Sequence, residues 1–152
     1  MRPNDYLNNP VIDQNFYNVK CTNVEVLDGN TLIQLRVVPY EPYGEAQEQV
    51  LHVTLRDSPK VQPIFDRFQQ TFRITQCPTE AIGRFGCIGV GTSTFRDKRY
   101  SAVHFIRQSD IAKKHARSLE QADRDGLIPW QIQRQPTQLV AGNTCAVISS
   151  ED

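Results

Sequence analysis

A chain of 152 residues with 17 basic and 17 acidic residues has zero net charge, and 39% of its residues are hydrophobic. The length predicts about one domain with a core of its own, and the composition is that of an ordinary globular protein. Neutrality argues against avid nonspecific binding to duplex nucleic acid. No apolar run reaches the roughly 18 residues of a membrane helix, and the N-terminus lacks the apolar stretch of a secretory signal. We therefore expect a cytoplasmic protein without a membrane partner.

The first third of the chain predicts an arm and three strands. Residues 1–15 are rich in Asn, Pro and Asp and are expected to form a loose arm. Apolar residues alternate over 16–27 and 31–38, and the tight-turn sequence Asp28-Gly29-Asn30 lies between these runs. This pattern is typical of a β-hairpin. A third strand is expected over 47–55.

A helix is expected over residues 58–72. Ser58 suits the N-cap and Pro59 suits the first helical position. The apolar residues that follow recur at helical spacing, which predicts an amphipathic helix with its aromatic stripe in the core. The stripe consists of Val61, Ile64, Phe65, Phe68 and Phe72.

The segment 83–106 predicts two further strands joined by a short charged turn. Its glycines are unfavourable in a flat strand, so they indicate curvature, a bulge or close approach of another backbone. The turn, Arg96-Asp97-Lys98-Arg99, is flanked by Phe95 and Tyr100. Basic and aromatic side chains on one hairpin tip favour binding of single-stranded nucleic acid. The alternative is an edge hairpin whose charges are simply solvated.

Charge is concentrated in the same part of the chain. Residues 84–117 carry eight basic and two acidic residues, a net charge of +6. The segments before and after it carry −3 each, since residues 1–83 have seven basic and ten acidic residues and residues 118–152 have two and five. A basic segment of this kind permits local contact with phosphates even in a neutral protein.

No catalytic or metal-binding pattern is present in the sequence. The four cysteines form no Cys-x-x-Cys pair and the three histidines are scattered, so we expect no zinc site and no cofactor. Paired carboxylates, a phosphate-binding loop and a nucleophile–base pair are also missing. We expect a binding protein and not an enzyme.

The predicted order is three strands, a helix and two strands, which is the element order of the OB-fold, a small five-stranded Greek-key barrel. We therefore expect a mainly β protein with an OB-like barrel over 16–108. Residues 109–152 are expected to add a surface helix, over 111–121, and a polar, partly disordered extension. An SH3-like barrel with an insertion and a β-sandwich fragment are alternatives with similar element strings.

Five segments of residues 16–107 are informative when taken together: Tyr17-Asn18-Val19, the runs 31–37 and 55–60, the glycine-rich strand 82–90, and the closing hairpin 96–103. With these segments, residues 16–107 resemble small OB-type single-stranded-DNA-binding-like proteins of phages and bacteria. The resemblance implies an OB barrel and a single-stranded-DNA-binding protein that assists replication or recombination. Residues 123–130 also look similar to the acidic-then-apolar tip by which bacterial single-strand-binding proteins recruit partners.

Two functions follow from these observations. The first is binding of single-stranded nucleic acid through basic residues and stacking aromatics. The alternative is an OB-like protein-interaction or assembly module, with a protein partner bound through the C-terminal extension. Leu127, Ile128 and Trp130 are expected to dock on the barrel or on a second subunit, and a second subunit would make the protein a homo-oligomer. The candidate nucleic-acid-binding residues are Arg84, Phe95, Arg96, Lys98, Arg99 and Tyr100, with Arg36 and Tyr43 as further members.

Overall fold

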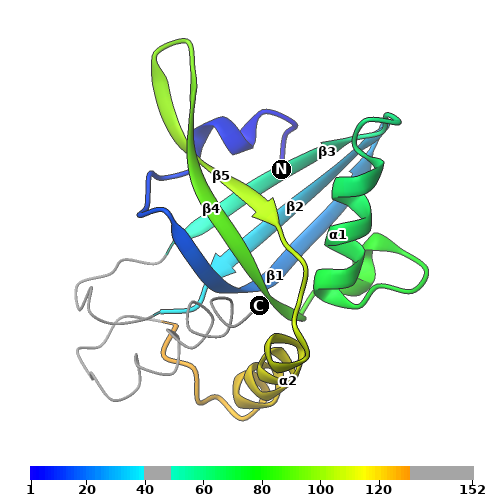
Figure 1. Ribbon diagram of the computed structural model, residues 1–152, viewed down its shortest axis with the longest axis vertical. Helices are drawn as coiled ribbons and strands as arrows, with labels where there is room; N and C mark the ends of the chain where they lie inside the picture. The colour runs from blue at the N-terminus through cyan, green and yellow to red at the C-terminus, as the bar shows by residue number, and fades with distance from the viewer. Residues whose placement is uncertain (40–48, 131–152) are drawn as a thin grey trace.

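The computed structural model describes residues 1–39 and 49–130. Tyr43 and the extension 131–152 lie outside the described residues. The strands and helices follow the predicted order (Figure 1). They are η1 (Asp5–Asn8), β1 (Asn15–Leu27), β2 (Asn30–Val37), β3 (Val50–Arg56), α1 (Gln62–Phe72), η2 (Pro78–Ala81), β4 (Phe85–Phe95), β5 (Lys98–Phe105) and α2 (Asp110–Arg124).

The strands form one antiparallel five-stranded sheet in the order β3-β2-β1-β4-β5. The mainly β class is therefore confirmed. The sheet is open, because no backbone ladder joins its two edge strands, β3 and β5. The expected five-stranded OB-like barrel is therefore not confirmed, because the sheet is not closed.

The N-terminal arm occupies the seam between the two edge strands. The Asn9 side chain is only 4% exposed. Its Nδ2 donates to the carbonyls of His52 on β3 and Ser101 on β5, both at 2.9 Å, and its Oδ1 accepts from the His52 N–H at 2.7 Å. One amide side chain thus satisfies backbone groups of both edges. The prediction of a loose arm over 1–15 is wrong, because η1 and Asn9 hold this segment against the sheet.

Helix α1 starts later than predicted. The chain turns first at Ser58, whose carbonyl accepts from the Val61 N–H at 3.0 Å, and the helix begins at Gln62 with Pro63 in its first turn. Proline is tolerated there because the first N–H groups of a helix have no intrahelical partner. The proline in the first turn of the helix is therefore Pro63 and not Pro59.

The two helices lie against different parts of the sheet. The main core lies between the sheet and α1, where Phe68 and Phe72 are fully buried and Phe65 is partly buried, as predicted. Ile64, another member of the predicted stripe, is 44% exposed and lies outside this core. A smaller cluster joins α2 to the start of β4 through Ala116, Leu119 and Phe85. In the described part of the chain, neither helix is long and apolar enough to cross a membrane.

Candidate functional site

The β4–β5 hairpin extends well beyond the rest of the sheet (Figure 1). Its turn has only two residues, Arg96 and Asp97, because Phe95 already pairs with Lys98. The two residues have φ of 51° and 64°, as in the type I′ turns that match the twist of a hairpin. Asparagine, aspartate and glycine tolerate this left-handed region, whereas other L-residues pay about 1–2 kcal/mol. Backbone strain is therefore located at Arg96, one of the candidate binding residues.

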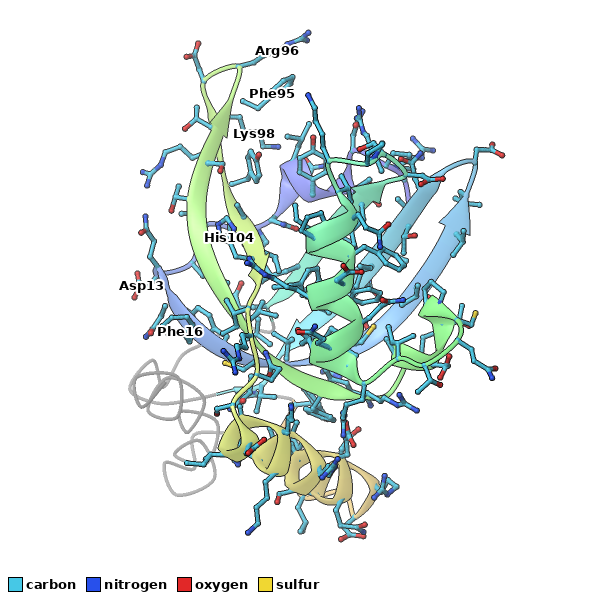
Figure 2. The ribbon with its side chains drawn as sticks, turned by 45° about the vertical axis from the view of Figure 1, so that its right-hand side comes forward. Asp13, Phe16, Phe95, Arg96, Lys98 and His104 are labelled. Carbon is cyan, nitrogen blue, oxygen red and sulfur yellow. The ribbon has the colours of Figure 1, made fainter. Side chains whose placement is uncertain are left out.

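Four candidate residues come together at the hairpin tip. Phe95 is 48% exposed, and the Arg96 guanidinium lies 5.2 Å from the centre of its ring. The Lys98 ammonium donates to Asn8 Oδ1 at 2.6 Å. The Tyr100 ring packs edge-on against Tyr6, with ring centres 5.7 Å apart. Figure 2 shows Phe95, Arg96 and Lys98 grouped at this end of the hairpin.

A small pocket lies between the hairpin tip and η1, and we call it the tip pocket. Its cavity volume is about 230 Å³. It presents two aromatic rings, two carboxamides and one ammonium group, which together can stack on a flat heterocycle, hydrogen-bond its edge and neutralise an attached phosphate. The lining residues are Asn4, Leu7, Asn8, Phe95, Lys98 and Tyr100.

The other candidate residues lie outside the tip pocket. Arg99 is exposed and pairs with Thr94, so its side chain leaves the strand on the face opposite Lys98 and Tyr100. Arg84 precedes β4 at the far end from the tip, where its Nη1 donates to the carbonyls of Phe72 and Arg73 at the end of α1. Its hydrogen bonds therefore give it a structural role.

Arg36 takes part in a separate cluster around Trp130. The guanidinium lies 4.4 Å from the indole ring centre, and the indole also packs against Phe85 at 5.9 Å. Trp130 Nε1 donates to Asp123, which also pairs with Lys20 at 2.6 Å. Burial alone would raise the pKa of Asp123, but the hydrogen bonds from Lys20 and Trp130 outweigh it and lower that pKa.

The apolar residues that follow α2 differ in whether they pack against the folded domain. Ile128 and Trp130 pack against the cluster formed by Phe85 and α2, so their docking onto the folded domain is confirmed. Leu127 is 68% exposed and does not share in this packing. Of Leu127, Ile128 and Trp130, two therefore dock onto the folded domain.

Three pocket residues, Asn4, Leu7 and Asn8, were not among the sequence candidates. They belong to or adjoin η1, which lies in the segment that was expected to form a loose arm. Isolated asparagines in an Asn- and Pro-rich segment carry no signal that separates a pocket residue from a loop residue. Their position depends on Asn9, which holds the arm in the seam between the edge strands.

Replacing Arg96 by Asn is expected to stabilise the fold while it weakens ligand binding. Asparagine adopts the left-handed region more easily than arginine, so the free energy of unfolding should rise by about 0.5–1 kcal/mol. Urea denaturation measures this change, with Thr94→Asn as the control in the strand beside the turn. A loss of stability in the Arg96 variant would contradict the assignment of strain to the turn.

Comparisons with known proteins do not assign this site. No protein-family model and no curated protein matches the chain. Over residues 1–39 and 49–130, no three His, Cys, Asp or Glu side chains gather as a metal site requires.

Proposed function

We propose that the protein binds single-stranded nucleic acid, with the tip of the β4–β5 hairpin as its contact surface. The tip pocket carries this proposal, because aromatic, carboxamide and ammonium groups from two distant parts of the chain meet there. An aromatic ring can stack on a base, a carboxamide can hydrogen-bond to the edge of a base, and an ammonium group can pair with a phosphate. The proposal is a binding function and requires no catalytic group.

The chemistry of the tip suits a strand whose bases are unpaired. A base on Phe95 or Tyr100 would gain about 1–3 kcal/mol from stacking, whatever its identity. Asn4 and Asn8 offer amide groups to the edge of that base. Arg96, Lys98 and Arg99 are all exposed around the turn and would contact phosphates on either side. A duplex cannot place a base in such a pocket, because its bases remain stacked on one another.

The architecture supports the same proposal. The sheet has five antiparallel strands, with α1 between the third and fourth. A partly open five-stranded barrel of OB type has these elements, and its β4–β5 loop is one of the loops that contact oligonucleotides. We therefore infer an OB-type fold, in agreement with the resemblance of residues 16–107 to single-stranded-DNA-binding-like proteins.

The test is a titration of the full chain against a fluorescein-labelled oligo-dT of about 16 nucleotides, the upper site size of an OB-fold. The variant carries Arg96→Ala, Lys98→Ala and Arg99→Ala together. Its affinity at low salt should fall by about tenfold or more, and the slope of log K against log salt should become shallower by about 1–2. Because these side chains are exposed, the melting temperature should change little.

The control variant makes the same change in net charge elsewhere. Lys60, Arg67 and Arg124 are exposed and line neither the tip pocket nor any other cavity described here, so their triple change to Ala should leave binding nearly intact. A Phe95→Leu variant should lose affinity without a change in salt slope. If both triple variants lose the same affinity for oligo-dT, the loss comes from the change in net charge and not from the hairpin tip. If the wild-type chain binds neither oligo-dT nor oligo-rU, the protein-interaction module becomes the better assignment.

A further inference from the structure

A large groove runs between α1, the β5–α2 connection and α2, at the opposite end of β5 from the tip. We call it the helix groove. Its cavity volume is about 1240 Å³, above the roughly 300–1,000 Å³ of a typical small-molecule pocket. A site of this size suits a polymer segment better than a compact metabolite.

Basic side chains line the helix groove, and two of them are available to bind a ligand. The side chains of Arg107 and Arg117 line it, are exposed, and make no hydrogen bond or ion pair within the described part of the chain. Lys113 also lines it and lies 3.9 Å from Asp110, an exposed pair that holds its partners weakly. Asp66 and Asp110 are the acidic lining residues. The lining includes Arg73 as well, but its guanidinium is bound to Glu120. The charge available to a ligand therefore favours an anion.

An aromatic residue links the helix groove to the outer face of the hairpin. Phe16 lines the groove and is 39% exposed. On the sheet it pairs with Gly89, which in turn pairs with His104. A Cβ at Gly89 would lie 3.6 Å from the Phe16 ring. Phe16 therefore belongs both to the groove and to this face of the sheet.

The face that leads from Phe16 to the tip carries little side-chain bulk. Strand residues two apart share a face, so Gly89, Gly91, Ser93 and Phe95 lie on one side of β4. Their partners on β5 are His104, Ala102, Tyr100 and Lys98. The residues between the two ends are thus glycine, alanine, serine and an exposed histidine. The His104 ring lies over Gly91, since a Cβ at Gly91 would be 3.2 Å from His104 Nε2, so this imidazole is the main side chain on the path. Figure 2 shows Phe16, His104 and Phe95 in this order from the base of the hairpin toward its tip.

We propose that the helix groove is a second contact site for the same single strand, which crosses the glycine-lined face between the groove and the tip pocket. Arg107 and Arg117 take its phosphates, and Phe16 provides a stacking surface at the groove entrance. This inference rests on the proposed function. The six residue steps from Gly89 to Phe95 span about 20 Å at the rise of a strand, so only an oligonucleotide of sufficient length reaches both sites.

The experiment compares oligo-dT of about 4 and about 16 nucleotides, the limits of OB-fold site sizes. A variant with Arg107→Ala and Arg117→Ala should bind the long oligonucleotide about fivefold to tenfold more weakly, with a salt slope reduced by about 1.4. Its affinity for the short one should change less than about twofold, because that ligand occupies the tip alone. The control, Lys114→Ala with Arg124→Ala, removes the same charge from exposed positions of α2 outside the groove. Thermal unfolding of each variant confirms that the fold is intact.

Each outcome separates this inference from the proposed function. If the hairpin variant loses affinity while the groove variant binds both lengths like the wild type, the groove proposal is overturned and the proposed function stands. If the groove variant loses both lengths equally, the groove is not an extension of the tip site and the proposal is also overturned. If the wild-type chain binds neither length, the proposed function fails and this inference fails with it.

Discussion

Replacing Asn9 by Leu is expected to lower the free energy of unfolding by about 3 kcal/mol or more. Leucine has a similar size but neither donates nor accepts, so two carbonyls and one N–H lose their partner. Each buried group left without a partner costs about 1–3 kcal/mol. Urea denaturation followed by tryptophan fluorescence measures the loss. Because Asn9 also anchors η1 beside the hairpin, the same variant should bind oligo-dT more weakly.

Asn8→Leu provides the matched control for this prediction. Asn8 is the neighbouring residue and is exposed, and among the described residues its side chain accepts a hydrogen bond only from the exposed Lys98. Its replacement should change stability by no more than about 0.5 kcal/mol. Similar stability for the two variants would show that the seam between β3 and β5 does not depend on the Asn9 amide.

The strand and helix order could be predicted because local signals and burial agree along most of the chain. In β2, alternation places Ile33 and Leu35 in the core, and in α1 the helical spacing does the same for Phe68 and Phe72. Periodicity reports which face is buried, and here the tertiary structure uses those faces. The predicted start of α1 at Pro59 was wrong, because Pro59 and Pro63 each fit the first turn of a helix and the local sequence does not choose between them.

The open seam could not be predicted, because it depends on contacts between residues far apart in the sequence. Asn9 bonds to residues 43 and 92 positions away, and nothing in its neighbourhood marks it as buried.

Residue type alone also could not divide the candidate arginines by role. Arg96 and Arg84 belong to the same glycine-rich segment, yet one lies at the exposed turn while the other bonds to the end of α1. Only the three-dimensional position of a basic side chain separates a free charge from a structural one.

Gly86→Ala is expected to destabilise the protein by about 2–3 kcal/mol through overpacking. A Cβ at position 86 would lie 2.5 Å from Thr71 Cγ2 and 3.0 Å from the Thr71 carbonyl oxygen. Thr71 cannot turn away easily, since it is 2% exposed and its hydroxyl donates to the Arg67 carbonyl at 2.7 Å. Helix α1 would have to move away from the sheet, with Phe72 beside it.

Gly89→Ala in the same strand is the control. It distinguishes a glycine needed for the close approach of α1, as at Gly86, from one that only allows the strand to curve. A Cβ there would meet its neighbours at 3.6 Å or more, which is ordinary contact. Alanine also reduces the conformational freedom of the unfolded chain, so stability should stay within about 0.5 kcal/mol or rise slightly. Chemical denaturation of both variants gives the comparison. Equal stabilities would show that α1 does not depend on close approach at Gly86, and that the glycines of β4 serve curvature alone.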